Sequence, residues 1–340
     1  MTTLLPPHPI PLPRDAGERG VILFAVLALV LAGAASDACA QSYPEKAVRV
    51  VSPFPAGGAA DTLARALAQK MTESFGRPAV VENRVGAGGT IGTDAVAKAA
   101  PDGYTLLLGN VSTLAVAPSV YTKLPYDPAQ DFSPITLVGR SPLVFAVHPS
   151  VPAKTPKELI ALARSQPGKM TFGSSGAGSI THFTGELLNA AGKVNITHVP
   201  YKGSPPVIQA ILSGEVDMGV LQVVEALPHQ RSGRMRALAV SGTQRSSAMP
   251  EIPHAGELGL RGLESTTWYC VVGPRGVPPA VVKTLHATLT KAIGGADFVK
   301  RFTADGVMPE SSTPDDLATL IRNDIHRWAE VAKRTGVKLD

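Results

Sequence analysis

The sequence predicts an α/β protein built from two doubly wound lobes with a ligand cleft between them. Strand-like and helix-like segments alternate along most of the chain, and the alternation occurs as two successive runs of the same kind. Glycine-rich turns stand between strands and helices, where sheets of this type bind their ligands. The chain has 340 residues, which is long for one compact domain and suits two.

Residues 1–40 are predicted to be a secretory signal peptide. An apolar run at 21–35 is followed by small residues at Ala38 and Ala40, the two positions that a signal peptidase recognises. The run is shorter than the ~20 residues that a membrane span needs. The alternatives are a membrane anchor and a lipoprotein modified at Cys39. The three residues before Cys39, SDA at 36–38, lack the apolar residue that a lipoprotein signal needs.

Composition excludes several classes of protein. The net charge is +5, but the basic residues are scattered and not interleaved with aromatic ones, so nucleic acid is not expected as a partner. A mild positive field suits an anionic small ligand. Cys270, the one cysteine of the predicted mature chain, can form neither an internal disulfide nor a thiolate metal site. His148, His198 and His254 show no metal-binding spacing, so no metal site is expected.

The first run contains three strands separated by two helices, which predicts a parallel sheet with helices on its faces. Leu63, Leu67 and Met71 fall on one face of the first helix. Asp61 is expected to cap its start and Gly76 to end it. The expected strands are 47–51, 79–81 and 104–108, and the expected helices are 61–74 and 90–99.

The second run has the same character. Thr155 precedes one helix as a cap, and Pro205 opens another at a position where its missing N–H costs nothing. The Trp268–Tyr269 pair either lines a cleft or belongs to the core. Expected strands are 143–147, 170–173, 196–199, 216–221, 237–240 and 268–272. Expected helices are 156–165, 180–191, 205–212, 279–293 and 314–335. We assign 41–142 and 268–340 to lobe 1 and 143–267 to lobe 2.

Three glycine-rich turns, at 53–61, 86–90 and 174–179, precede helices. Backbone N–H groups and the positive end of the helix dipole face outward at such places and bind carboxylate or phosphate. The alternative is that the glycines only form turns. The first and third turns occupy equivalent positions in the two lobes and could face each other. The second turn departs from the dinucleotide fingerprint, and no P-loop lysine follows, so no cofactor is expected.

A hydrolase is a second possibility. Ser175 lies in a turn that is similar to a nucleophile elbow, with His182 on the next helix. However, the G-x-S-x-G pattern needs a glycine at position 177, where the chain has Ala177. The sequence therefore favours a binding protein over an enzyme.

An ordered set of segments resembles the periplasmic substrate-binding proteins of the tripartite tricarboxylate transporter, the Bug or TctC family. The resemblance covers the whole predicted mature chain at normal spacing. The segments that carry it are PFPAGGAAD (53–61), ENRVGAGGTIGTDAVAKAAPDGYTLLLGN (82–110), FGSSGAGSITH (172–182), VPYKG (199–203), LSGEVDMG (212–219), ALPHQRSGRMRALAV (226–240) and DIHRWAEVAKRTGVKLD (324–340).

The resemblance implies a periplasmic binding protein type II-like fold that closes over a small carboxylate, such as a di- or tricarboxylate, an amino acid or an aromatic acid. It further implies a non-enzymatic, periplasmic monomer that delivers its ligand to an inner-membrane permease. A sensor that presents the carboxylate to a signalling receptor is the alternative. Carried over by position, the ligand-binding residues are Phe54, Ala56, Gly57, Gly58, Ala59, Asp61, Asn110, Ser112, Ser174, Gly178, Ser179, His182, Tyr201, Lys202 and Gly203. Asp61 is expected to order its loop rather than to touch the anion.

The chain departs from the family pattern after the strand at 216–219. Many members continue with a Phe-Asp or Phe-Asn type of segment at the cleft, whereas this chain has VLQVVE at 220–225. Gln222 could supply a neutral donor among apolar neighbours. This departure favours a carboxylate with an apolar or amide-bearing body.

Overall fold

The structure is a computed structural model that describes residues 43–260 and 262–339. The predicted signal peptide, with the alternatives of an anchor or a modified Cys39, lies outside the described residues. The chain divides into a unit that ends at Glu45 and a unit that begins at Lys46. The description below concerns the second unit.

The first sheet has the strand order β2-β1-β3-β9-β4, with β10 paired to β4. Strand β1 runs parallel to β2 and β3, and β9 is antiparallel to both β3 and β4. The predicted parallel arrangement therefore holds for three strands, and the antiparallel pair completes the sheet. The strands are β1 (Val48–Ser52), β2 (Ala79–Asn83), β3 (Thr105–Asn110), β4 (Phe132–Val147), β9 (Thr266–Pro274) and β10 (Met308–Pro309).

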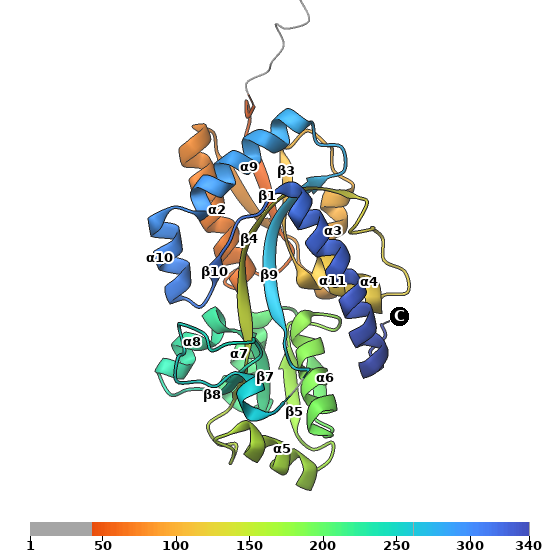
Figure 1. The fold of residues 1–340 in the computed structure, drawn as a ribbon, viewed down its shortest axis with the longest axis vertical. Coiled ribbons are helices and arrows are strands. Elements are labelled where there is room, and N and C mark those ends of the chain that lie inside the picture. Colours follow the sequence, from red (N-terminus) through yellow and green to blue (C-terminus); the bar gives the residue numbers. More distant parts are fainter. Residues whose placement is uncertain (1–42, 261, 340) are drawn as a thin grey trace, which may run out of the picture. The chain divides into compact units, whose positions relative to one another are not determined.

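The second sheet continues from the same strand β4, which is 16 residues long. Strand β4 pairs with β9 up to Pro142 and with β7 from Leu143 onward, and Figure 1 shows β4 and β9 side by side. The predicted strand at 143–147 is thus the end of a longer one. The partition into lobes at 142/143 and 267/268 is a proposal that rests on this change of partners. The other strands of the sheet are β5 (Thr171–Ser174), β6 (Thr197–Pro200), β7 (Met218–Gln222) and β8 (Arg236–Val240).

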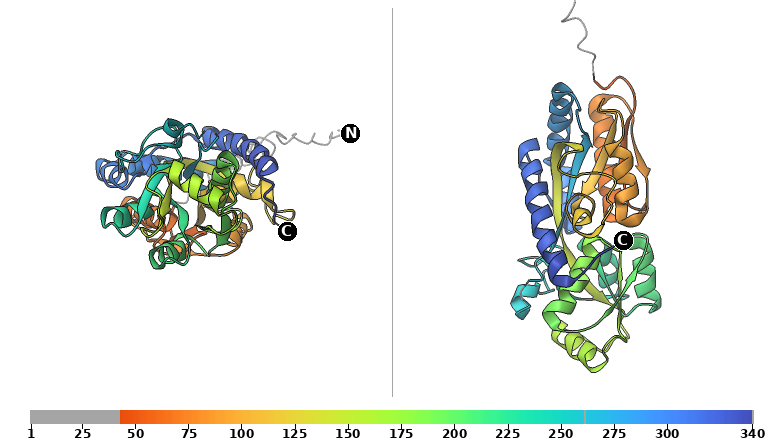
Figure 2. Two further views of the ribbon diagram at one scale, coloured as in Figure 1. Left: turned by 90° about the horizontal axis from the view of Figure 1, so that it is seen from below. Right: turned by 90° about the vertical axis from the view of Figure 1, so that its right-hand side faces the viewer.

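Helices cover both sheets, and the long helix α11 packs along β4 and also reaches α6 (Figure 2). The helices are α2 (Ala59–Phe75), α3 (Thr90–Ala97), α4 (Ala117–Val120), α5 (Pro156–Ser165), α6 (Ile180–Gly192), α7 (Ser204–Ser213), α8 (Val223–Arg231), α9 (Pro279–Ile293), α10 (Ala296–Ala304) and α11 (Pro314–Thr335). Short helical turns η2 (Ala87–Gly89), η3 (Ser112–Val116) and η4 (Ala255–Leu258) complete the set.

The first helix shows why local patterns succeeded and where they failed. The predicted apolar face of α2 is buried, and Gly76 ends the helix in the left-handed conformation, as expected. The prediction that Asp61 caps the start is wrong. The helix begins two residues earlier, with Gly58 as the cap, and Asp61 lies in its first turn. Thr155 caps α5 as predicted, because its side chain accepts from the Glu158 amide.

Helix α8 is the main element that the sequence did not predict. It carries Pro228 in its interior, a residue that normally ends a helix, and it follows β7 without an intervening turn. The first half of β4 and helix α10 were also not predicted. The first turn of α8 becomes important below, since it brings a carboxylate to the cleft.

The side chains of Trp268 and Tyr269 have different surroundings. Successive side chains of a strand point to opposite faces. Trp268 belongs to the hydrophobic core and its indole Nε1 donates to Asp324 Oδ2 at 2.7 Å, which ties β9 to α11. Tyr269 instead lines a small cavity. Both alternatives for the pair are therefore realised, one by each residue.

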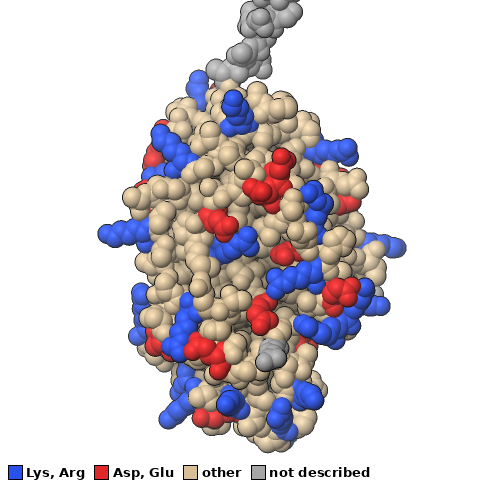
Figure 3. All heavy atoms as spheres, in the orientation of Figure 1, with Lys and Arg blue, Asp and Glu red and all other residues tan. Residues whose placement is uncertain are grey.

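The surface carries no concentration of one charge on the face drawn in Figure 3, where basic and acidic side chains are interspersed. Among the residues that the structure describes, no helix is long and apolar enough to cross a membrane. The described residues also contain no group of His, Cys, Asp or Glu side chains suited to hold a metal ion.

The bond between Trp268 and Asp324 predicts a measurable stability effect. An Asp324→Ala variant leaves a buried indole N–H without its partner, which costs about 1–3 kcal/mol. Urea denaturation of both proteins measures the difference. Asp324→Asn is the matched control, since it keeps an oxygen acceptor and should lose clearly less. Equal losses in the two variants would contradict the assignment.

Candidate functional site

Four loops meet where parallel strands of the two sheets end. They follow β1, β2, β5 and β6, and they enclose a cavity of about 210 Å³ that we call the loop cavity. Its lining comprises Pro53, Phe54, Pro55, Val85, Gly86, Ala87, Gly88, Gly89, Tyr121, Ser175, Gly176, Ala177, Pro200, Tyr201, Lys202 and Gly203. The second glycine turn, at 86–90, is thus part of the candidate site, although the sequence analysis favoured the first and third turns.

The loops approach each other closely. A β-carbon on Gly88 would lie 2.9 Å from the Ala177 carbonyl oxygen. A β-carbon on Gly203 would lie 2.4 Å from Pro55 Cγ, and Gly203 has a φ of +101°. Only glycine fits at both positions, because the space is occupied and the conformation is left-handed. The glycines therefore allow the loops to approach closely, Gly88 against the backbone of Ala177 and Gly203 against the ring of Pro55.

The loop cavity has donors that the protein itself does not use. Among the described residues, the backbone amides of Gly86, Ala177 and Lys202 have no hydrogen-bond partner. The Lys202 side chain is exposed at the rim. The Tyr201 hydroxyl donates to Glu215 Oε1 at 2.6 Å, and burial together with that carboxylate raises the pKa of Tyr201 to about 12. The Tyr201 hydroxyl is thus already used, whereas the three amides and the Lys202 ammonium can receive an anion.

Three amides of the first loop, by contrast, those of Gly57, Gly58 and Ala59, donate within the protein. The Gly57 amide donates to Asp61 Oδ2 at 3.0 Å, and the Gly58 amide to the Pro55 carbonyl oxygen at 3.4 Å. Burial acts to raise the pKa of Asp61, but Arg65, the Gly57 amide and Asn83 outweigh it and hold the pKa below its usual value. Asp61 therefore orders this loop. Ala56 and Gly57 are exposed and line neither cavity described here.

In the third loop the residues that reach the cavities are Ser175, Gly176 and Ala177. The residues carried over from the family lie behind them, in a network with His198: Ser174 Oγ bonds His198 Nε2 at 2.6 Å, the Gly178 amide donates to His182 Nδ1, and Ser179 caps α6. A β-carbon on Gly178 would point at Leu339, 2.7 Å away. Ser174, Gly178, Ser179 and His182 thus support the loop from within.

The hydrolase alternative finds no support in the geometry around Ser175. Its hydroxyl pairs with Thr181 Oγ1 at 2.8 Å, whereas His182 accepts from the Gly178 amide. A serine nucleophile needs a base within hydrogen-bond reach. The described residues hold no such base at Ser175.

A second, smaller space of about 20 Å³ adjoins the loop cavity, with which it shares Phe54 and Ser175. We call it the buried cavity. Its lining comprises Phe54, Ala59, Ala60, Asn110, Ser112, Ser175, Ser204, Gln222, Glu225 and Tyr269. Asn110, Ser112 and Gln222 were predicted site residues, and the structure brings them together here. Ser112 Oγ accepts the Ile180 amide at 3.0 Å, which joins η3 to the start of α6.

Glu225 is the residue that sequence reasoning missed, and Tyr269 is one that it left open between cleft and core. Glu225 lies in the first turn of α8, and its Oε1 accepts the Ala59 amide at 3.1 Å from the start of α2. The Q-x-x-E spacing of Gln222 and Glu225 after a strand matches a capping box and could have revealed the helix start. Nothing in the sequence indicated that this carboxylate would lie opposite α2.

Comparison with known proteins agrees with this geometry. The model of the tripartite tricarboxylate transporter family receptor, TctC, matches residues 63–337. The chain belongs to this family. The family consists of substrate-binding proteins, so the chain is a binding protein and not an enzyme.

Solved structures confirm the predicted two-lobed α/β fold of this receptor. Periplasmic binding protein BugD superposes with a TM-score of 0.84 at 34% identity, over 87% of this chain and 99% of BugD. MatC from Rhodopseudomonas palustris with bound malate gives 0.82 at 34% identity, over 85% of this chain and 99% of MatC. An R. palustris protein with adipate gives 0.85 at 34% identity, over 87% and 99% of the two chains.

Among curated relatives, BugT of Bordetella pertussis is 38% identical to this receptor over 320 residues, which are 93% of this chain and 98% of BugT. A protein encoded between tcbD and tcbE in a Pseudomonas strain is 36% identical over 93% of this chain and 94% of its own length.

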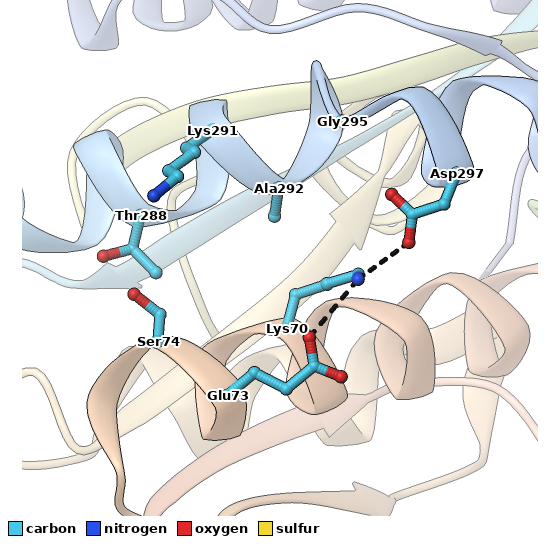
Figure 4. A pocket seen from close by; sticks show the side chains of 8 residues that line it. All are labelled: Lys70, Glu73, Ser74, Thr288, Lys291, Ala292, Gly295 and Asp297. Atoms are coloured by element: carbon cyan, nitrogen blue, oxygen red, sulfur yellow. Dashed lines mark hydrogen bonds and ion pairs between the residues drawn. The ribbon is translucent and has the colours of Figure 1, made fainter.

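The receptor has another hollow, of about 290 Å³, between α2 and the region of α9 and α10 (Figure 4). Lys70 on its wall is paired with Asp297 at 2.7 Å and with Glu73 at 3.3 Å. Its lining shares no residue with the loop cavity or the buried cavity. Lys70, Glu73 and Asp297 pair with one another there, and the hollow is separate from the candidate site.

The histidine pair behind the third loop predicts a pH effect on the stability of this receptor. His182 and His198 stack at 3.7 Å, and burial lowers their pKa values to about 3 and about 4. Their unfolded pKa is ~6.5, so the unfolded state binds the protons. Stability should be full above pH 6.5 and should fall by roughly 2 kcal/mol per histidine between pH 7 and pH 5.

Urea denaturation between pH 7 and pH 5 tests this expectation. A His198→Gln variant removes one of the two titrating groups. The fall in its free energy of unfolding between pH 7 and pH 5 that is due to histidine should be about half that of the native receptor, whatever its stability at pH 7. An unchanged slope would show that the pair does not govern the pH dependence.

Proposed function

We propose that this receptor captures a small carboxylate in the loop cavity and delivers it, in the periplasm, to the permease of a tripartite tricarboxylate transporter. One observation carries the proposal. Gly86, Ala177 and Lys202, whose amides are unused, come from loops of both sheets and line a single cavity of about 210 Å³. Unpaired amides and a nearby ammonium bind carboxylate, and the volume lies below the ~300–1,000 Å³ typical of drug-sized ligands.

The relatives support the same class of ligand. Structures with adipate and with malate are similar to this chain over most of its length. The residues we propose to contact the ligand include Phe54, Tyr201, Lys202 and Gly203, which were predicted, and Gly86–Gly89 and Ser175–Ala177, which line the same space. Asn110, Ser112 and Gln222 are proposed to act at the buried cavity.

Ligand binding by contact with loops of both sheets favours the state in which the loops meet, because the anion then satisfies donors on both sides at once. Export through the predicted signal peptide at 1–40 would place the receptor beside its permease. We propose that the receptor acts as a monomer there.

A thermal-shift panel on the purified chain from residue 41 onward tests the ligand class. Small carboxylates at 100 times their dissociation constant should stabilise the protein by about 2.7 kcal/mol. Sugars and nucleosides of similar size should give no shift, since they lack the anionic group. Stabilisation by sugars alone would refute the proposal.

The close approach of the loops gives a second test. Gly203→Ala should weaken carboxylate binding at least tenfold, because its methyl group would strike Pro55 and hold the loops apart. Gly233→Ala is the matched control: Gly233 also has a positive φ, of +69°, but has open space around it. Isothermal titration measures both. If the two variants bind equally well, the close approach of Gly203 to Pro55 is not needed for carboxylate binding.

A further inference from the structure

Glu225 is a buried acid at the meeting point of the two sheets. Its Oε1 accepts the Ala59 amide at 3.1 Å, and its Oε2 accepts the Gln222 amide at 3.0 Å. The Gln222 side chain is best oriented with its nitrogen toward the same carboxylate, to which it then also donates. Each oxygen of Glu225 thus faces N–H donors, which is the arrangement of an ionised carboxylate.

This acid occupies the position that an incoming anion would use. The Ala59 amide belongs to the first turn of α2, where the helix dipole favours negative charge. Because Glu225 already accepts that amide, the Ala59 N–H is not available to a carboxylate of the ligand. At the loop cavity the amides of Gly86, Ala177 and Lys202 are unused, and its lining contains no acid. The two cavities therefore differ in charge, since the buried cavity holds Glu225 and the loop cavity has Lys202 on its wall.

The lining of the buried cavity contains no compensating cation. Its ten residues include one acid, Glu225, and no Lys, Arg or His. Burial raises the pKa of Glu225 even though the Ala59 and Gln222 amides act to lower it. A second carboxylate placed here would meet a like charge at short range, which is strongly unfavourable. A group that donates hydrogen bonds would relieve the buried charge.

A second observation points to a missing partner. The Tyr269 side chain lines the buried cavity and the residue is only 1% exposed, yet its hydroxyl makes no hydrogen bond of standard geometry to any described residue. A buried polar atom without a partner costs about 1–3 kcal/mol, so such an atom at a cavity wall indicates that a guest supplies the bond.

The volume limits the size of that guest group. The buried cavity measures about 20 Å³. One water-sized group needs ~10–15 Å³, so the space accepts one such group but not a carboxylate with its three heavy atoms. An ammonium or hydroxyl group has the required size, and both donate hydrogen bonds.

We propose that the ligand of this receptor carries a hydrogen-bond donor, an ammonium or a hydroxyl group, in addition to its carboxylate. The carboxylate occupies the loop cavity, and the donor enters the buried cavity and bonds to Glu225 and Tyr269. This inference rests on the proposed function and narrows it: the receptor selects amino or hydroxy acids and rejects dicarboxylates.

Three matched series of acids test the inference by isothermal titration. Each has a carboxylate at one end and one to four methylene groups, and the other end is an amine, a hydroxyl or a second carboxylate. For the native receptor we expect the best amino or hydroxy acid to bind at least tenfold more tightly than the dicarboxylate of equal length.

Two variants assign that preference to the buried cavity. Glu225→Gln should reduce the tenfold preference to about one, because it removes the negative charge and keeps the shape. Tyr269→Phe should weaken amino and hydroxy acids several-fold and leave dicarboxylates unchanged. Glu251→Gln makes the same change of charge at an exposed site and should retain the native preference. Thermal melting establishes that each variant is folded.

The outcomes separate the inference from the function on which it rests. Tighter binding of dicarboxylates by the native receptor, or a preference that survives in both Glu225→Gln and Tyr269→Phe, overturns the inference and leaves carboxylate capture intact. Failure of every acid in all three series, and in the wider carboxylate panel, overturns both.

Discussion

Strand β4 belongs to both sheets, and the site depends on this one constraint. The strand pairs with β9 along its first part and with β7 and β8 along its last part. The parallel strands β1, β2, β5 and β6 then end where their loops can meet. Because those loops follow strands of both sheets, a ligand between them contacts both halves of the receptor. In the proposed function, the meeting of these loops and the binding of the ligand are therefore coupled.

Glycines allow the loops to meet closely. Gly88 faces the Ala177 backbone carbonyl, and Gly203 faces the ring of Pro55. Most side chains that surround these loops hold them in place: Asp61 from the start of α2, and the His182–His198 stack behind the third loop. A site made in this way binds the feature shared by its ligands, the carboxylate, with rigid amides. The other residues that line the two cavities can then set which carboxylate is selected, while the amides that hold the carboxylate stay the same.

In this chain the wall of the buried cavity carries an acid, Glu225. The segment after β7 places Glu225 against the start of α2, at a point where the chain departs from the family pattern and where the sequence predicted only a neutral donor, Gln222. The two residues act together, since Gln222 donates to Glu225 through its backbone amide. The result is a cleft with donors at the loop cavity and an acceptor at the buried cavity. Such polarity is the basis of the proposal that the ligand carries a hydrogen-bond donor in addition to its carboxylate.

Sequence alone determined what depends on local pattern. Apolar spacing located the buried face of α2, Gly76 and Thr155 marked helix ends, and glycine turns identified loops that enclose the loop cavity. Their physical causes act within a few residues. Tertiary structure alone decided which loop amides are used within the protein, that Tyr269 points to the cavity while Trp268 points to the core, and that Glu225 lies opposite Ala59. Those facts depend on contacts between residues more than a hundred positions apart, such as Ala59 and Glu225. Periodicity and capping rules carry no information about contacts of that separation, because the packing of β4, β7 and α8 sets them.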